Sequence, residues 1–132
     1  MSSDYKDKRP FRSSGVLDSF KHALTGIFSA ILHERNIQIH LVISFVVVVL
    51  GLFFRITPIE WILISFAIGG VISLELVNTA IERVVDLVTE EYHPLAKQAK
   101  DIAAGAVLIY ALLSVIVGFI IFFPKLINMF LL

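Results

Sequence analysis

The sequence predicts an all-α integral membrane protein with a single domain, residues 1–132, in which an N-terminal amphipathic surface helix precedes three transmembrane helices. Two observations predict this fold class. First, 58% of the 132 residues are hydrophobic, a larger share than soluble domains usually have. Second, these residues fall in three long stretches that are almost free of charge, and the charged residues gather between them. Soluble helices of this composition would have almost no polar face for water.

The three apolar stretches are long enough to cross a bilayer. The first, "IHLVISFVVVVLGLFF", begins at Ile39 and is extended at the interface by the preceding "NIQ". The second begins at Ile59 and, after Glu60, has Glu75 as the one charge within its apolar part; the third begins at Ile102 and is uncharged. A spanning helix needs about 17–25 mainly apolar residues. We therefore expect membrane helices over residues 36–54, 59–85 and 95–123.

The segment 16–35 is expected to form a surface helix behind a polar tail, residues 1–15. Its hydrophobic residues recur at helical spacing with polar and basic residues between them, which is typical of a helix that lies in the membrane interface. Two roles are open for it: a simple anchor, or a platform that presents an amphiphile to a site just inside the membrane. These hydrophobic residues are Val16, Leu17, Phe20, Leu24, Ile27, Phe28, Ile31 and Leu32.

The Lys and Arg residues predict the orientation of the chain. Six of them precede the first span, the loop after it has only Arg55, and the second loop has Arg83, Lys97 and Lys100. Basic residues favour the cytoplasmic side of a membrane. We therefore expect the N-terminus and the second loop inside, and the first loop and the C-terminus outside.

Four oxygen-bearing side chains form an acid row at the end of the second span, in "SLELVNTAIERVVD". At 100° per residue, Glu75, Asn78, Glu82 and Asp86 fall within an arc of about 80° and extend over about 16 Å of one helix. Counted from Trp61, Glu75 lies about 21 Å along the helix, inside the hydrocarbon but toward the cytoplasm. An ionisable group at the bilayer centre costs about 2.5–3.5 kcal/mol on insertion scales.

The acid row has two interpretations. In one, Glu75 is uncharged and hydrogen-bonded between helices, and its neighbours are ordinary polar residues of a helix end. In the other, the outlying carboxylates hold Mg²⁺, which prefers oxygen ligands, while Glu75 abstracts a proton from the hydroxyl of a lipid. The four groups on one stripe favour the second interpretation.

A second polar patch, "TEEYHPLAKQAKD", follows the acid row. Pro94 is typical of a helix start, and the small residues after Asp101 allow close approach between membrane helices. This approach would bring Lys100 and Asp101 near Glu82 and Asp86, so Lys100 is a candidate phosphate contact. Lys97 is interpreted as a residue that snorkels to the interface.

Several other kinds of site are excluded by the sequence. It has no cysteine for a disulfide or a thiolate site, and no glycine-rich phosphate loop. A formal net charge of zero gives no indication of a nucleic-acid partner. The histidines His22, His33, His40 and His93 are too dispersed for a zinc site, and each is interpreted as an interface residue.

Residues 73–109, "SLELVNTAIERVVDLVTEEYHPLAKQAKDIAAGAVLI", resemble the prokaryotic diacylglycerol kinase family, especially its Gram-positive branch, whose members act as undecaprenol kinases. The flanks "SFKHALTGIFSA", "HERNIQIH" and "GFIIFFPK" agree, so the resemblance covers nearly the whole chain from about residue 9. It implies a homotrimer in the bacterial cell membrane, with active sites between subunits, that transfers the γ-phosphoryl group of Mg·ATP to undecaprenol or diacylglycerol.

The resemblance also implies roles for single residues. Glu75 matches the catalytic base, and Glu82 matches a ligand of the metal and of ATP. Some members have a second metal-binding Glu at the place of Phe28 or Ser29, so here either Glu34 supplies that ligand or fewer protein groups hold the metal. The residues that the resemblance assigns to ATP are Arg9, Glu34, Asn78, Glu82, Asp86, Glu91, Tyr92, His93, Lys100 and Asp101.

Two non-enzymatic alternatives remain open from the sequence. A small transporter or proton-relay subunit would use Glu75 as an intramembrane carboxylate but would leave Lys100 and Asp101 without a role. A purely structural membrane module would explain neither Glu75 nor the acid row. The sequence does not specify which lipid alcohol is the substrate, and similarity to the Gram-positive branch favours undecaprenol.

Overall fold

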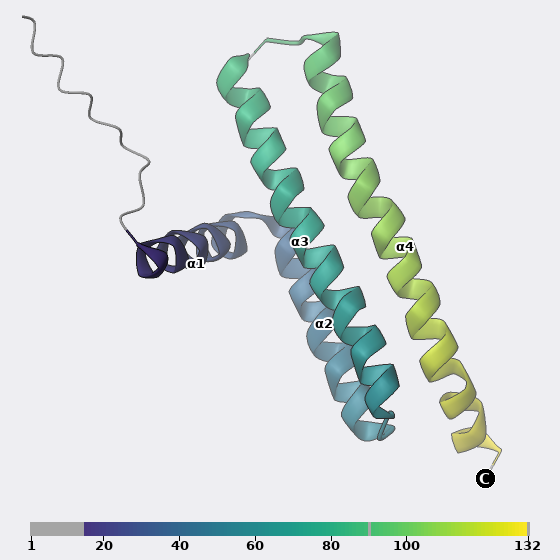
Figure 1. Ribbon diagram of the computed structural model, residues 1–132. Coiled ribbons are helices and arrows are strands. Elements are labelled where there is room, and N and C mark those ends of the chain that lie inside the picture. The colour runs from purple at the N-terminus through teal and green to yellow at the C-terminus, as the bar shows by residue number, and fades with distance from the viewer. Residues whose placement is uncertain (1–14, 90, 132) are drawn as a thin grey trace, which may run out of the picture.

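Four helices make up the computed structural model, which describes residues 15–89 and 91–131 (Figure 1). α2, α3 and α4 run alongside one another, and α1 points away across their common direction. Each of α2, α3 and α4 is long and apolar enough to cross a membrane, so the all-helical class and the three spanning helices are confirmed. The bounds are α1 Val16–His33, α2 Arg35–Phe53, α3 Pro58–Val88 and α4 Pro94–Phe130.

The last helix extends further than the apolar pattern predicts. We expected the third span to end at residue 123, but α4 continues through Pro124 to Phe130. A proline removes one backbone hydrogen bond within a helix, and membrane helices tolerate this loss where other groups compensate. The extension lets Lys125 Nζ reach Glu60 Oε1 of α3, at 3.1 Å.

The turn between α2 and α3 begins with a Schellman motif. The Ile56 N–H donates to the Gly51 carbonyl at 3.1 Å, and the Arg55 N–H donates to the Leu52 carbonyl at 3.3 Å. Arg55 lies in the left-handed region at φ 49°, the position at which glycine is usual in this motif. Ile56 is buried below the turn, so the motif has the hydrophobic contact that often accompanies it.

A capping box starts α3 directly after that turn. The Glu60 N–H donates to Thr57 Oγ1 at 3.3 Å, and the Thr57 N–H donates to Glu60 Oε2 at 2.6 Å. Pro58 occupies the first helical position, where its missing N–H removes no helix hydrogen bond. Residues of the connection and its two helix ends thus provide the acceptors for the N–H groups of Arg55, Ile56, Thr57 and Glu60.

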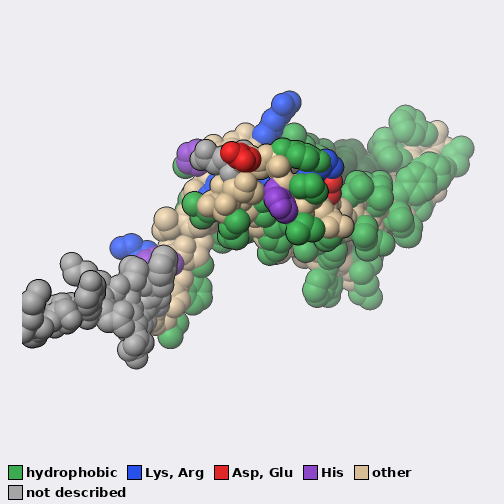
Figure 2. All heavy atoms as spheres, turned by 90° about the horizontal axis from the view of Figure 1, so that it is seen from above, with side chains coloured by type: hydrophobic (Ala, Val, Ile, Leu, Met, Phe, Trp, Pro, Cys, Tyr) green, Lys and Arg blue, Asp and Glu red, His purple; other side chains and the backbone are tan. Residues whose placement is uncertain are grey.

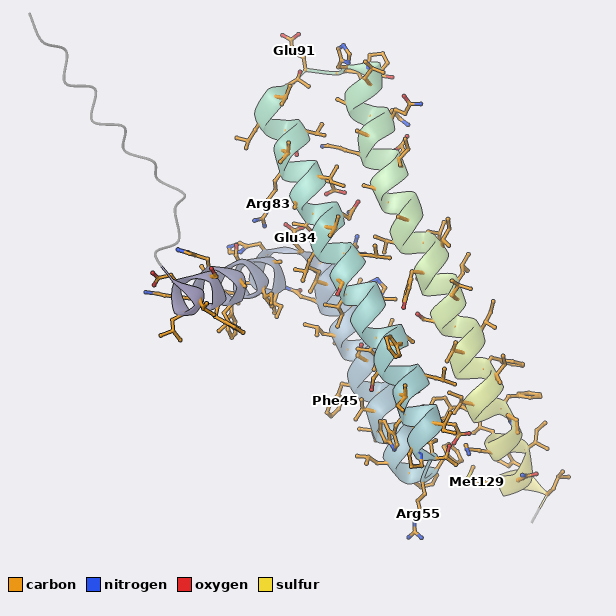
Figure 3. All side chains as sticks on the ribbon, viewed as in Figure 1. Glu34, Phe45, Arg55, Arg83, Glu91 and Met129 are labelled. Atoms are coloured by element: carbon orange, nitrogen blue, oxygen red, sulfur yellow. The ribbon has the colours of Figure 1, made fainter. Side chains whose placement is uncertain are left out.

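The hydrophobic core lies at the end of the molecule that holds this turn. Its buried members come from the turn, from α3 and from the C-terminal part of α4, and Trp61 lies against them. Elsewhere large hydrophobic side chains remain exposed, such as Phe45, which points away from the bundle in Figure 3. Exposed apolar flanks suit a protein whose surroundings are acyl chains. The buried core residues are Ile56, Ile64, Ile121 and Phe122.

Contact between α3 and α4 continues through the middle of both helices. Tyr110 Oη donates to the Phe66 carbonyl at 3.0 Å, and Ser114 Oγ lies 3.4 Å from the Ala67 carbonyl oxygen. The Tyr110 ring occupies the space beside Gly70, where a Cβ atom would lie 2.1 Å from the ring carbon Cζ. Gly70 is therefore the residue that lets the ring cross α3.

A single extended residue, Glu34, separates α1 from α2. Its N–H donates to the Ala30 carbonyl at 2.8 Å, and Gln38 Nε2 donates to the Ile31 carbonyl at 3.0 Å. These bonds hold the end of α1 on the start of α2. The hydrophobic side chains of α1 stay largely exposed, among them Leu17 and Phe20, so they are available to surroundings other than this chain.

Candidate active site

The acid row of α3 passes from a buried carboxylate to an exposed one. Glu75 and Asn78 are 4% and 6% exposed, Glu82 is half-buried, and the Asp86 side chain is 60% exposed. α4 covers part of α3, and α2 lies against it as well. Along the row, the Glu75 carboxylate is therefore shielded from bulk water, whereas the Asp86 carboxylate is in contact with it.

His40 of α2 is the side chain that meets the buried end of the row. Its Nε2 lies 3.3 Å from Glu75 Oε1, and the two side chains are 23% and 5% exposed. Ser44 Oγ donates to the His40 carbonyl at 2.7 Å, one turn further along α2. The interpretation of His40 as an interface residue missed this contact, because the two residues lie 35 positions apart in the sequence (75 − 40). The feature of the sequence that could have pointed to this contact is a single histidine within an apolar stretch.

Asn78 joins the buried end of the row to the half-buried one. Its Nδ2 donates to Glu82 Oε1 at 3.0 Å. Its Oδ1 is buried and has no hydrogen-bond partner among the residues that the structure describes. A buried acceptor without a partner is costly, so this oxygen marks a place where a donor or a cation would be stabilised.

The end of α1 reaches α3 at the level of Glu82. Arg83 Nη2 donates to Glu34 Oε1 at 2.8 Å, and Figure 3 shows the two labelled side chains turned toward each other. Because Arg83 directly follows Glu82, the ion pair brings Glu34 to the turn of α3 that carries the proposed metal ligand. Arg83 is already bonded to one of the two carboxylate oxygens of Glu34.

A cavity of about 490 Å³ lies where α3 and α4 are joined. Lys100 Nζ is 2.5 Å from Asp86 Oδ1, which links the two helices across it, while Asp101 Oδ2 is bonded to Lys97 at 2.6 Å. Lys100 thus meets the acid row as expected, whereas Asp101 is paired with Lys97 on its own helix. Polar side chains lining the cavity include Asp86, Glu91, Tyr92, His93, Lys97 and Lys100.

Charged and histidine side chains gather at this end of the molecule. Figure 2 looks onto it and shows Lys and Arg, Asp and Glu, and His side chains close together, with hydrophobic side chains on the flanks of the helices. His93 caps α4 through Nδ1, which accepts from the Leu95 N–H at 3.2 Å. Arg9, which the resemblance assigns to ATP, lies outside the described residues.

The donor set of the row fits Mg²⁺ that arrives with a nucleotide. No group of three or more His, Cys, Asp or Glu side chains within residues 15–89 and 91–131 is arranged to hold a metal alone. Mg²⁺, however, usually takes one or two carboxylates together with substrate phosphates and water. Glu82 offers a half-buried carboxylate beside the unpartnered Asn78 Oδ1, so the residues are compatible with this mode of binding.

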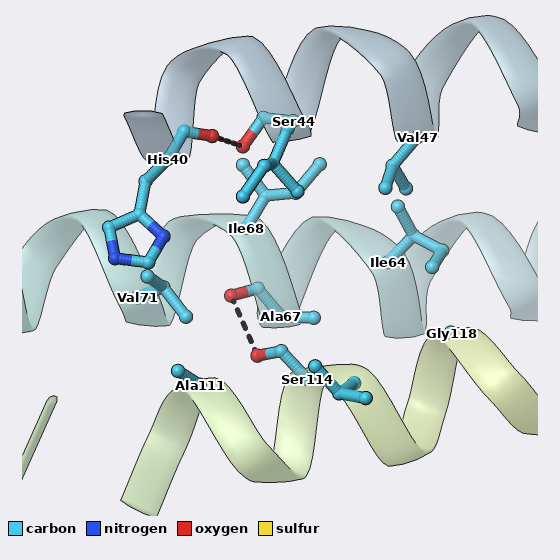
Figure 4. Close-up of a pocket in the computed structure, with 12 residues that line it drawn as sticks. His40, Ser44, Val47, Ile64, Ala67, Ile68, Val71, Ala111, Ser114 and Gly118 are labelled. Atoms are coloured by element: carbon cyan, nitrogen blue, oxygen red, sulfur yellow. Dashed lines mark hydrogen bonds between the residues drawn. The ribbon is translucent and has the colours of Figure 1, made fainter. Parts of the chain in front are cut away.

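An apolar crevice of about 220 Å³ opens between α2, α3 and α4 (Figure 4). Small residues such as Ala67, Ala111 and Gly118 leave the space, and Ser114 spans it to the Ala67 carbonyl. His40 lines one end of it. The contact between His40 and Glu75 therefore lies at the polar end of an otherwise apolar space.

The arrangement combines a buried carboxylate within a bundle of apolar helices with a cavity lined by acidic and basic side chains at one end of the bundle, as expected of an enzyme that phosphorylates a lipid. Residues 21–122 match the family model described as prokaryotic diacylglycerol kinase. The chain belongs to the prokaryotic diacylglycerol kinase family, and it is accordingly a membrane lipid kinase, which implies the use of ATP.

Three relatives sharpen the comparison. The chain is 51% identical to the undecaprenol kinase of Bacillus subtilis over 93% of its own length and 99% of that protein. It is 38% identical to a diacylglycerol kinase of Synechocystis, over 92% of this chain and 74% of the relative. It is 33% identical to a diacylglycerol kinase of Haemophilus influenzae, over 82% of this chain and 92% of the relative. The resemblance to the Gram-positive branch is confirmed by the first of these.

Proposed function

We propose that this protein transfers the γ-phosphoryl group of Mg·ATP to undecaprenol and so forms undecaprenyl phosphate. The observation that carries the chemistry is the buried carboxylate of Glu75, held against His40 at the head of a row that becomes exposed toward Asp86. The higher identity to an undecaprenol kinase than to the two diacylglycerol kinases supports the choice of lipid. Diacylglycerol, which would give phosphatidate, is the second candidate.

Glu75 acts as the general base in this proposal. Its carboxylate accepts the proton of the lipid hydroxyl while that oxygen attacks the γ-phosphorus, and the bond from the γ-phosphorus to the bridging oxygen breaks to release ADP. Phosphoryl transfer depends mainly on positioning and charge neutralisation, and a proton-accepting group contributes typically 10²–10⁴-fold. The burial of Glu75 keeps the base away from water that would compete with the lipid.

The other members of the acid row and the residues of the cavity hold the nucleotide. Glu82 and Glu34 would bind Mg²⁺, which neutralises charge on the phosphates when it is bound. Lys100 leaves Asp86 and contacts the phosphates. The remainder of ATP is bound by residues of the cavity, of the acid row and of the N-terminal segment: Glu91, Tyr92, His93, Asn78, Asp86, Asp101 and Arg9. One oxygen of Glu34 is bonded to Arg83, so the other oxygen would serve the metal.

The proposed assembly and orientation follow from the family and from the charges. We place the N-terminus in the cytoplasm of a bacterial cell, where ATP is available, and the C-terminus outside the inner membrane. The exposed hydrophobic face of α1 would lie in the cytoplasmic interface as an amphipathic helix. A homotrimer with sites between subunits would supply the site with walls that one chain does not provide.

Incubation of the purified protein with labelled ATP and each lipid separately tests the function. We expect labelled undecaprenyl phosphate, formed with a higher kcat/KM than labelled phosphatidate. Greater activity on diacylglycerol would reverse the choice of lipid. An absence of any labelled lipid, in protein that is folded and bound to Mg·ATP, would favour the transporter or relay interpretation of Glu75.

A further inference from the structure

His40 is an unusual residue for its place in the chain. After Arg35 it is the only ionisable residue of α2, and an ionisable side chain within a membrane helix is costly unless a partner or a function offsets it. Its partner in the structure is Glu75, at 3.3 Å. The Glu75 side chain is buried at 5% exposure, and the His40 side chain is partly covered at 23%.

A carboxylate that abstracts a proton needs a fixed orientation. The terminal torsion of a glutamate is broad and roughly two-fold, so burial alone does not decide which oxygen faces a substrate. His40 approaches Oε1 of Glu75 through Nε2, which leaves Oε2 for another group. The ring is carried by α2, whose position beside α3 is determined by helix packing and by the short turn that joins the two helices.

The contact between His40 and Glu75 lies beside the apolar crevice. His40 lines the crevice, and Ala67, Ile68 and Val71 line it from α3, the helix that carries Glu75. The imidazole thus borders an apolar space between three helices (Figure 4) and also contacts the buried carboxylate of Glu75. A lipid hydroxyl that approaches Glu75 would meet a carboxylate already engaged on one side.

We propose that His40 is a positioning residue for phosphoryl transfer: its Nε2–H donates a hydrogen bond to Oε1 of Glu75 and holds the carboxylate so that Oε2 accepts the proton of the lipid hydroxyl. This inference rests on the proposed role of Glu75 as the base. His40 itself does not touch the reacting atoms. The proton passes from the hydroxyl to Oε2 of Glu75, and the hydrogen bond from His40 is retained throughout.

A matched pair of substitutions isolates the hydrogen bond. Gln and Met are unbranched and similar in length, but only Gln carries an N–H donor. We expect His40→Met to lower kcat for lipid phosphorylation about 10–100-fold, the size typical of lost support for a site residue, with KM for ATP unchanged. His40→Gln should recover most of that loss. Ser44→Ala, which changes a crevice residue bonded to the His40 backbone, should leave kcat within about twofold.

A double-mutant cycle separates a positioning role from a general effect on the fold. If His40 acts through Glu75, the variant with both His40→Met and Glu75→Gln should be no slower than Glu75→Gln alone. The inference is overturned if His40→Met keeps wild-type kcat, if His40→Gln is no better than His40→Met, or if the loss is equally large in both backgrounds. His40→Leu replaces the Met variant where that variant does not assemble.

The same series distinguishes failure of the inference from failure of the proposed function. Wild-type rates for Glu75→Gln would remove the base assignment and the inference with it. An inactive Glu75→Gln together with a fully active His40→Met would overturn the inference alone and leave Glu75 as the base.

Discussion

The two halves of α3 differ in which side chains they bury and in how their polar groups are paired. The half that follows Pro58 is capped by Thr57 and Glu60 and contributes Ile64 to a core with α4. The half that ends at Val88 buries Glu75 and Asn78 and leaves Asn78 Oδ1 without a partner in the described chain. One half satisfies its polar groups and the other retains an unsatisfied one. We interpret the first half as support for the fold and the second half as the part that serves the proposed reaction.

The largest expected effect is on Glu75 in the second half. Glu75→Gln keeps the size of the side chain but removes the proton acceptor, so we expect lipid phosphorylation to fall about 10³-fold, within the range for a general base. The assay uses labelled ATP and undecaprenol with protein whose assembly is verified by size-exclusion chromatography. Glu60→Gln is the control from the first half, because Gln also completes a capping box. If Glu75→Gln and Glu60→Gln lowered lipid phosphorylation equally, the two halves of α3 would not differ in function.

Glu82 should show a smaller effect, directed at the metal. Glu82→Gln keeps an oxygen for Asn78 Nδ2 but loses a negative charge, so the Mg²⁺ concentration for half-maximal activity should rise about 10–100-fold. Titration of activity with Mg²⁺ at fixed ATP measures this shift. Glu34→Gln, studied in parallel, shows whether Glu34 is the second ligand. Unchanged metal dependence in Glu82→Gln would remove Glu82 from the metal site.

Gly70, near the middle of α3, tests packing alone. A Cβ atom there would lie 2.1 Å from the Tyr110 ring, whereas nothing lies within 4 Å of a Cβ at Gly69. We expect Gly70→Ala to reduce the free energy of unfolding by about 1–3 kcal/mol, as overpacking usually does. Gly69→Ala should be neutral or stabilising, since alanine is the better helix former. Thermal denaturation in detergent compares the two, and equal Tm values would contradict the observed contact.

The smallest effect is expected at the cap of the first half. Thr57→Ala removes the acceptor for the Glu60 N–H and should reduce stability by about 1 kcal/mol, the usual cost of losing such a cap. Phosphorylation at a temperature well below the Tm should be unchanged. A loss of activity without a loss of Tm would mean that the first half contributes to the reaction.

Periodicity and hydrophobicity predicted the helices well, because both are local properties of the chain. The acid row could be predicted for the same reason, since Glu75 and Asp86 share a face wherever that segment is helical. The contact of Lys100 with Asp86 was expected from small residues that allow α3 and α4 to approach. The extension of α4 to Phe130 was not expected, because the predicted span covered only the uncharged apolar stretch that ends at residue 123.

Contacts between distant segments could not be predicted in this way. His40 meets Glu75, and Glu34 meets Arg83 across 49 positions, through the relative rotation of α1, α2 and α3. Side-chain spacing within one helix carries no information on that rotation. His40 was interpreted as an interface residue, and its contact with Glu75 is determined by helix packing.

The connection from Phe54 to Pro58 has a consequence for biogenesis. In the proposed orientation, with the N-terminus in the cytoplasm, this tip is the part of the α2–α3 hairpin that must be translocated through the hydrocarbon. Its Schellman motif and capping box give partners to the N–H groups of Arg55, Ile56 and Thr57, which lowers the cost of dehydrating them during passage. The same tight tip would let α2 and α3 enter the bilayer as one helical hairpin, with His40 and Glu75 already on adjoining helices before α4 is inserted.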